Sequence, residues 1–166
     1  MFKYFPTNYV WNLSVDLAIE MGARIGEIEA MCAPLQEVAK KPDAEGTQAF
    51  RDTWEKMADQ LCELAQEDEA RGRLFSAGEK YGRAASYLLT CERLQAHNAP
   101  NRLDLYKRML DLFEKGTRLA GENCERVEIP YGGKHISGLL VQAENVTGPA
   151  PLLVQVNGLD STKEMK

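Results

Sequence analysis

The apolar residues change their spacing at Gly121, and this change limits the folds that the 166-residue chain can adopt. Before Gly121 they recur at steps of three and four, which is the spacing of one helical face. After Gly121 they alternate with polar residues, as in a half-buried strand. We therefore expect a helical part, residues 1–122, followed by a β part, residues 123–166.

The helical part is expected to hold several helices joined by short loops. Glycine and proline weaken the first of them, so two or three short helices are expected there rather than one long one. The expected bounds are two or three helices within 17–35, a loop at 40–46, and longer helices at about 47–66, 74–94 and 100–121.

Each expected helix has an apolar face that predicts its core side. These faces comprise Leu17, Met21, Ile25, Ile28, Cys32 and Leu35; then Phe50, Trp54, Met57, Leu61 and Leu64; then Ala77, Tyr81, Ala84, Ala85, Leu88 and Cys91; and finally Leu103, Tyr106, Leu110 and Phe113. For the aromatic side chains at helical spacing, core packing is the default interpretation and a wall of a substrate pocket the alternative; they are Trp54, Tyr81, Tyr87, Tyr106 and Phe113.

The β part predicts a hairpin, one buried strand and the start of a helix. The segments ERVEIPY and HISGLLVQAE flank Gly132-Gly133, which predicts a β-hairpin. Residues 151–156 (PLLVQV) read as a buried strand of the parallel-sheet kind. A tight turn is expected at 157–160, and Ser161 with Glu164 fits a capping box at a helix start.

This turn is the candidate functional site. Gly158 allows the backbone to turn tightly, so that the N–H of Leu159 or Asp160 can point into a cavity. Such a donor, with the helix dipole behind it, suits the oxyanion of an acyl-transfer reaction. An ordinary strand-to-helix loop is the alternative on local physics alone. Asp160 and Glu164 also form a possible acid–base pair, although a solvated helix start with Lys163 fits them better.

Composition argues against several other functions. The formal net charge is −5, without a block of one sign or a basic patch, so nucleic acid is not an expected partner. The chain lacks both glycine-rich phosphate-binding motifs, G-x-G-x-x-G and G-x-x-x-x-G-K-[ST]. No apolar run reaches membrane-spanning length, and no signal-peptide core is present. No cofactor is expected.

The cysteines predict neither a metal site nor disulfides. They are Cys32, Cys62, Cys91 and Cys124, with no C-x-x-C pair and no neighbouring histidine pair. Buried, reduced thiols in a cytoplasmic protein are the expectation.

The sequence shows no complete catalytic set. Residues 74–78 (LFSAG) resemble the end of a G-x-S-x-G nucleophile motif, but Leu74 replaces the first glycine and Ser76 falls inside an expected helix. His97 and His135 are not close in sequence to a candidate nucleophile. The other serines are Ser14, Ser86, Ser137 and Ser161, and none stands at a strand-to-helix elbow.

Several stretches, taken in order, resemble one known family. They are EKYGRAASYLLTCERL, LYKRMLDLFEKG, the hairpin and NGLDSTKE; the most specific pieces are G-x-x-x-x-R-A-A-x-Y at 78–87 and G-L-D-S-T-K-E at 158–164. They resemble the α/β hydrolases with an N-terminal helical domain, the family of 2,6-dihydropseudooxynicotine hydrolase and of the fungal polyketide-shortening hydrolase of pigment synthesis. The resemblance covers residues 4–166.

The resemblance implies a fold and an activity. The fold would be an α/β hydrolase, seen here as its N-terminal helical domain plus the first strands of its sheet, namely the hairpin and one buried strand. The activity would be serine-dependent hydrolysis of a carbon–carbon bond next to a ketone, or of an ester, in a small or medium organic molecule. The turn would supply one oxyanion-hole N–H, on Leu159, with Asp160 as the second candidate.

The resemblance also implies partners. The nucleophile, acid and histidine segments of the family are missing from these residues, so we expect the remainder of the hydrolase to belong to the same or a second chain. The helical domain would cover the active site and form a homodimer. A non-enzymatic helical dimerisation or scaffold module is the alternative.

Overall fold

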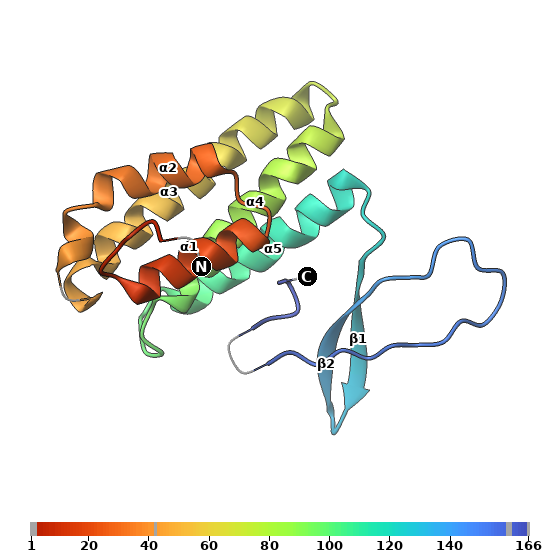
Figure 1. The fold of residues 1–166 in the computed structure, drawn as a ribbon. Coiled ribbons are helices and arrows are strands. Elements are labelled where there is room, and N and C mark those ends of the chain that lie inside the picture. Colours follow the sequence, from red (N-terminus) through yellow and green to blue (C-terminus); the bar gives the residue numbers. More distant parts are fainter. Residues whose placement is uncertain (1–2, 42, 159–160, 166) are drawn as a thin grey trace. The chain divides into compact units, whose positions relative to one another are not determined.

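The computed structural model describes residues 3–41, 43–158 and 161–165, and for residues 43–46 the backbone alone. The chain divides into two compact units, Met1–Ala120 and Gly121–Lys166, which we call the helical unit and the β unit. Figure 1 shows the helices of the first unit and the hairpin of the second. Each unit is described by itself.

The described part of the helical unit contains five α-helices. They are α1 (Tyr9–Glu20), α2 (Ile25–Cys32), α3 (Asp43–Ala70), α4 (Leu74–Arg93) and α5 (Arg102–Ala120), with short 3-10 turns at Ala33–Leu35 and Val38–Lys40. The helices predicted at 74–94 and 100–121 are confirmed. The loop predicted at 40–46 is wrong from Asp43 onward, because α3 begins at Asp43.

The core of the helical unit is built around α4. This helix packs against α3, α5 and α1, and it lies between α3 and α5 in Figure 1. Its whole predicted inward face is buried, from Ala77 to Cys91. A chain of aromatic rings continues this core, with centroid separations of 5.2, 4.8, 5.0 and 5.5 Å along Phe5, Trp11, Phe50, Trp54 and Tyr87. Core packing of Trp54, Tyr81 and Tyr87 is thereby confirmed.

Three predicted apolar faces are only partly correct. Leu64 of the face predicted within 47–66 is 49% exposed, whereas Phe50, Trp54 and Leu61 are buried. Ile25 is 75% exposed, because α1 ends at Glu20 and α2 begins at Ile25, which breaks the continuous face that the pattern implied. Leu103 is 61% exposed, and α5 buries a different set, namely Leu105, Met109, Gly116 and Thr117.

The close contact between α4 and α5 depends on one glycine in each helix, beside the buried Leu105 and Met109 of α5. A Cβ on Gly78 of α4 would lie 2.4 Å from the Ala120 nitrogen, and a Cβ on Gly116 would lie 2.8 Å from the Gly82 nitrogen. Atoms cannot approach this closely without repulsion, so the two helix backbones can meet only because both positions lack a side chain.

The β unit contains the predicted hairpin. Strands β1 (Glu125–Tyr131) and β2 (Lys134–Leu140) are antiparallel, with Tyr131 opposite Lys134. Gly132 and Gly133 have φ angles of 55° and 75°. A two-residue turn with both φ angles positive matches the twist of the two strands, and glycine adopts it without steric cost.

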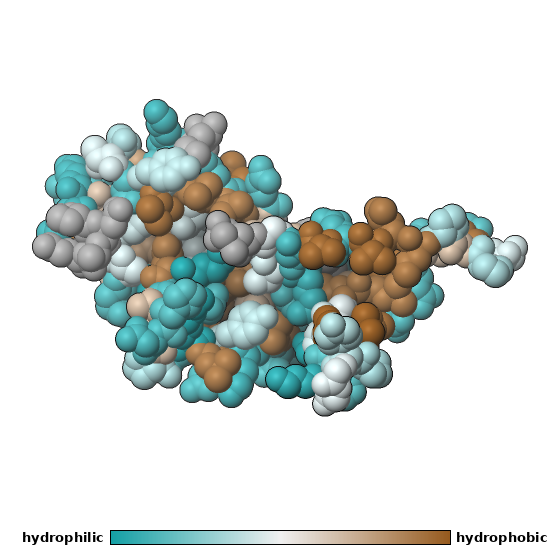
Figure 2. Space-filling model, turned by 90° about the horizontal axis from the view of Figure 1, so that it is seen from below, coloured by the Kyte–Doolittle hydropathy of each residue, from teal (hydrophilic) through white to brown (hydrophobic). Residues whose placement is uncertain are grey.

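The buried strand predicted at 151–156 is wrong. These residues form neither helix nor strand, and Leu153 and Val156 are 90% and 85% exposed. A strand needs a neighbour to bond its N–H and C=O groups, and within the described residues only β1 and β2 pair. Figure 2 accordingly shows apolar side chains gathered on the surface of the β unit, at the right of the view.

Candidate functional site

The predicted oxyanion turn begins in an exposed, irregular segment. Gly158 is exposed, and its carbonyl oxygen accepts hydrogen bonds from the Ser161 N–H at 3.4 Å and from the Ser161 hydroxyl at 3.3 Å. Leu159 and Asp160, the two predicted oxyanion donors, lie outside the described residues. Their role stays a prediction.

The helix predicted from Ser161 is wrong for the described residues 161–165. In a capping box the Ser161 hydroxyl would accept a hydrogen bond from the Glu164 N–H, whereas here it donates to Gly158. The Met165 N–H bonds to the Thr162 carbonyl oxygen at 3.1 Å, and Lys163 pairs with the Glu164 carboxylate at 2.7 Å. A single turn fixes several residues for one hydrogen bond, which is unfavourable without further turns.

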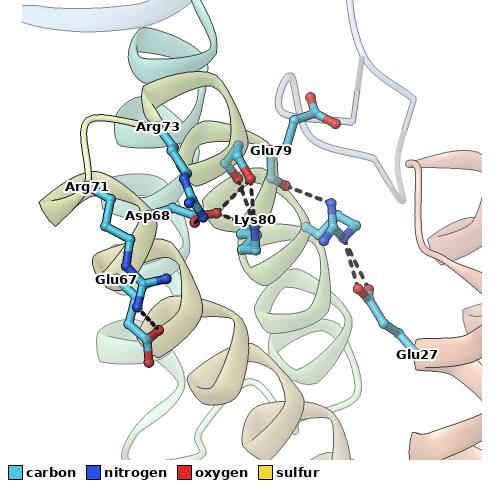
Figure 3. A network of polar contacts seen from close by, with 9 residues as sticks. Glu27, Glu67, Asp68, Arg71, Arg73, Glu79 and Lys80 are labelled. Carbon is cyan, nitrogen blue, oxygen red and sulfur yellow. Dashed lines mark hydrogen bonds and ion pairs between the residues drawn. The ribbon is translucent and has the colours of Figure 1, made fainter.

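The second specific motif of the sequence, at 78–87, lies in α4 and makes long-range polar contacts. Three clusters of polar side chains connect α4 to other helices, and Figure 3 labels Asp68 and Lys80 of one cluster and Glu27 of another. We name them the Asp68 cluster (Asp68, Ser76 and Lys80), the Glu69 cluster (Glu69, Tyr81 and Lys115) and the Glu27 cluster (Glu27, Arg83 and Tyr87).

The Asp68 cluster joins α3 to the start of α4. Asp68 Oδ2 accepts a hydrogen bond from the Ser76 hydroxyl and one from Lys80 Nζ, both at 2.6 Å, and Lys80 Nζ also lies 2.8 Å from Ser76 Oγ. The hydrogen bond from Lys80, followed by that from Ser76, lowers the pKa of Asp68 to about 2. Arg73 adds a second cation, 3.6 Å from Oδ1.

This arrangement does not activate Ser76 as a nucleophile. Activation needs a neighbouring base that can take the hydroxyl proton. A carboxylate with a pKa of about 2 is a weak base, and the Lys80 ammonium already donates to that same carboxylate. Ser76 also lies in the first turn of a helix, not at the end of a strand.

The Glu27 cluster joins α2 to α4. Arg83 Nε lies 3.2 Å from both carboxylate oxygens of Glu27, and Arg83 Nη1 donates to the Glu79 carbonyl oxygen at 3.2 Å. The Tyr87 hydroxyl donates to Glu27 Oε2. Burial, and then the hydrogen bond to Glu27, raises the pKa of Tyr87, so this phenol stays protonated and serves as a hydrogen-bond donor.

The Glu69 cluster joins α3, α4 and α5. Glu69 Oε2 accepts a hydrogen bond from the Tyr81 hydroxyl at 3.1 Å and pairs with Lys115 Nζ at 2.8 Å. Lys115 also lies over the Tyr81 ring, 4.3 Å from its centroid. The hydrogen bond from Lys115 lowers the pKa of Glu69, and the same bond raises the pKa of Lys115.

Each cluster pairs its own carboxylate with its own cation, so we assign the three clusters a structural role. Sequence reasoning had missed Glu27, Glu69 and Lys115 because their partners lie far away in sequence. The available signal was the presence of Lys80, Arg83 and two tyrosine hydroxyl groups, Tyr81 and Tyr87, in the same helix as the predicted inward face.

The remaining chemical groups do not form a site within the part of the chain that the structure describes. No group of three or more His, Cys, Asp or Glu side chains there is arranged to hold a metal ion. Cys32, Cys62 and Cys91 are buried free thiols, and burial raises the pKa of Cys32 and of Cys91 to about 12. Among the described helices, none combines the length and the apolar character needed to cross a membrane.

Comparison with known proteins shows which proteins the chain is similar to. It is 31% identical over 173 aligned residues to hydrolase LUC6 of Fusarium sp, an alignment that covers 99% of this chain and 40% of the relative. It is 29% identical to the alpha/beta hydrolase gkaG of Penicillium citrinum, covering 86% of this chain and 33% of the relative. A third relative, 20-hydroxy-prefusarin hydrolase FUS2 of Gibberella moniliformis, is 30% identical over 86% of this chain and 34% of its own length.

These similarities extend over most of the helical and β units, and they relate the chain to fungal proteins named as hydrolases, one of them as an alpha/beta hydrolase. The chain spans about a third to two fifths of the length of the curated relatives it matches. The sequence matches no family model.

Proposed function

We propose that the chain is the N-terminal part of a serine-dependent α/β hydrolase. In this proposal residues 1–122 form a helical domain that provides walls of the substrate pocket and excludes water, and residues 123–166 begin the catalytic domain. The Leu159 N–H, with Asp160 as the second candidate, stabilises the oxyanion, and Gly158 gives the turn its shape. The serine, acid and histidine belong to polypeptide outside these residues.

The similarity to proteins named as hydrolases, over 99% of the chain in one case, is the observation that carries this proposal. The described serines give it further support. Ser76 is paired with Asp68 and Lys80, and Ser137 is paired with Glu128 and Arg126, so neither is linked to a histidine in a triad.

The substrate that we propose is a small or medium organic molecule with a ketone or an ester. One relative is named as a hydrolase of 20-hydroxy-prefusarin, which supports an organic molecule of this size class. The reaction would be hydrolysis of an ester, or of a carbon–carbon bond next to the ketone, through an acyl-enzyme. The buried free thiols support a reducing compartment, the cytoplasm.

Hydrolysis of a p-nitrophenyl ester tests the proposal. We expect turnover by a protein that contains these residues together with the proposed serine, and only background release of p-nitrophenol from the 166-residue chain. Turnover by the 166 residues alone would refute the proposed location of the nucleophile.

Two proline variants test the proposed oxyanion donor in the active protein. Leu159→Pro removes the backbone N–H and is expected to lower kcat by about 10²–10³-fold. Leu159→Ala keeps the N–H and serves as the control, and Asp160→Pro separates the two candidate donors. Equal kcat values for Leu159→Pro and Leu159→Ala would exclude Leu159 as the donor.

Self-association of the helical unit is a second candidate function, either in support of the enzyme or on its own. Tyr9, Val10 and Leu13 are exposed apolar residues at neighbouring positions of α1, and Tyr9 is 66% exposed. A contiguous apolar surface of this kind favours a protein partner, which we propose to be a second copy. Light scattering should show a dimer that Leu13→Lys disrupts and that the control Leu103→Lys, on α5, leaves intact.

A further inference from the structure

The sequence contains one Asn-Gly pair, Asn157-Gly158. Both residues are exposed, and they follow the irregular segment 151–156 without entering a helix or a strand. An asparagine side chain can be attacked by the backbone nitrogen of the next residue when the backbone is free to bend and that residue is small. We propose that Asn157 is a site of spontaneous covalent modification, in which it converts to aspartate and isoaspartate.

The reaction requires only these two residues and water. The Gly158 backbone nitrogen loses its proton to solvent and attacks Asn157 Cγ, forming a five-membered succinimide ring. The Cγ–Nδ2 bond breaks and the amide nitrogen leaves as ammonia. A water molecule then opens the ring at one of its two carbonyl carbons, which leaves aspartate or isoaspartate at position 157. Nothing is oxidised or reduced.

The contacts of Gly158 are compatible with this attack. Its hydrogen bonds with Ser161 are made through the Gly158 carbonyl oxygen, at 3.4 Å and 3.3 Å, and not through the attacking nitrogen. Because glycine carries no Cβ, its nitrogen is also less crowded than that of any other residue.

The other asparagines provide comparisons within the same molecule. Asn12 is buried in α1, where its Oδ1 accepts a hydrogen bond from the Phe5 N–H at 2.7 Å and its Nδ2 donates to the Phe5 carbonyl oxygen. Asn145 is exposed in a loop, as Asn157 is, but the β-branched Val146 follows it and crowds the attacking nitrogen. Asn157 should therefore react faster than either.

The product differs from the original residue in charge and in backbone length. Either product adds one negative charge to a chain whose formal net charge is −5, and isoaspartate also inserts a side-chain carbon into the backbone before Gly158. The inference does not rest on the hydrolase proposal, because the reaction uses no catalytic group.

The test is incubation of the 166-residue chain at 37 °C and mildly alkaline pH, followed by peptide mass spectrometry. We expect the mass gain of amide-to-acid conversion at Asn157, at least about tenfold faster than at Asn145, which corresponds to about 1.4 kcal/mol of activation free energy. No conversion at Asn157, or equal rates at the two positions, would overturn the proposal.

Gly158→Ala is the matched variant for the mechanism. The φ angle of Gly158 is not among the positive ones, and within the described residues an added Cβ would meet only the Ser161 hydroxyl oxygen, at 3.9 Å, so alanine is compatible with this part of the chain. We expect this variant to slow conversion at Asn157 by about tenfold, equivalent to about 1.4 kcal/mol, with the rate at Asn145 unchanged. An unchanged rate at Asn157 would exclude the succinimide route.

Discussion

At the scale of single residues, Asp68 holds the junction between α3 and α4. Its carboxylate accepts hydrogen bonds from Ser76 and Lys80, and its carbonyl oxygen accepts one from the Arg73 N–H at 2.8 Å. The backbone of Asp68 therefore binds the connection between α3 and α4, and its side chain binds the first two turns of α4. Buried or half-buried carboxylates of this kind make stability depend on pH.

Asp68 should stabilise the folded chain only at pH values above the range in which its carboxylate titrates. Its pKa is about 2 when folded, below the ordinary value of 3.8, so its contribution is complete above about pH 4 and is lost as the pH falls toward 2. In urea unfolding, Asp68→Asn should lower the free energy of unfolding at pH 7 and should flatten its decline between pH 4 and 2. Asp104→Asn, an exposed carboxylate of α5, is the control and should change neither.

The Tyr87 hydroxyl should stabilise the helical unit through Glu27. Tyr87→Phe leaves Glu27 bound to Arg83 but removes one hydrogen bond to a half-buried carboxylate, which should cost about 1.5 kcal/mol. Thermal or urea unfolding measures the change. Tyr106→Phe, a half-buried tyrosine of α5, is the control; equal effects of the two variants would show that the bond to Glu27 contributes little.

Sequence reasoning reached the core residues more readily than their polar partners. Spacing alone identified Trp54, Tyr81 and Tyr87 as core, because burial follows the helical period. It did not pair Glu27 with Arg83, which lies 56 positions away. That pairing depends on how α2 packs against α4, and local patterns carry no information about it.

At the scale of elements, α5 packs closely on α4 because glycines at the contact carry no side chain. The sequence pattern gave both helices their bounds but assigned the inward face of α5 to Leu103 and its periodic neighbours. In the structure α5 instead presents the face that carries Gly116 to α4. Backbone contact at Gly116 brings the two helices closer than large side chains would allow. A pattern of apolar residues does not report a contact made by glycine.

Two alanine substitutions in α4 should have opposite effects. Gly78→Ala places a Cβ 2.4 Å from the Ala120 nitrogen and should destabilise the chain by about 1–3 kcal/mol through overpacking. Gly82→Ala meets no atom within 4 Å and should stabilise it by about 0.5–1 kcal/mol through helix propensity. Urea unfolding of both variants measures the pair, and effects of the same sign would contradict the close approach of α4 and α5.

The prediction of a strand at 151–156 was wrong for a reason that also concerns how elements pair. Its composition suits a buried parallel strand, and composition is all that a sequence pattern reports. Whether such a segment becomes a strand depends on a neighbour that can bond its backbone. The hairpin could be predicted because β1 and β2 supply each other's partner across Gly132-Gly133.

At the scale of the whole chain, the exposed apolar residues of the β unit should cause association. Leu152, Leu153, Val154 and Val156 are exposed in a row that is free of charge. Light scattering should show mass growing beyond a dimer as concentration rises.

A charged double variant should suppress this growth. Leu153→Lys combined with Val156→Lys places two like charges in the segment and should hold the mass constant with concentration. Val141→Lys, an exposed residue of the same unit outside the segment, is the control. Growth that is undiminished in the double variant would assign the association to another surface.

The three polar clusters have α4 in common, and their partners lie on α2, α3 and α5. Insertion or deletion of one residue between Ser76 and Tyr87 would rotate the part of α4 after it by about 100° relative to the part before it, so that the helix could not keep all three clusters at once. Length variation among proteins that share this arrangement should therefore fall in the connections at 33–42 and 94–101, while the number of residues from Ser76 to Tyr87 stays constant.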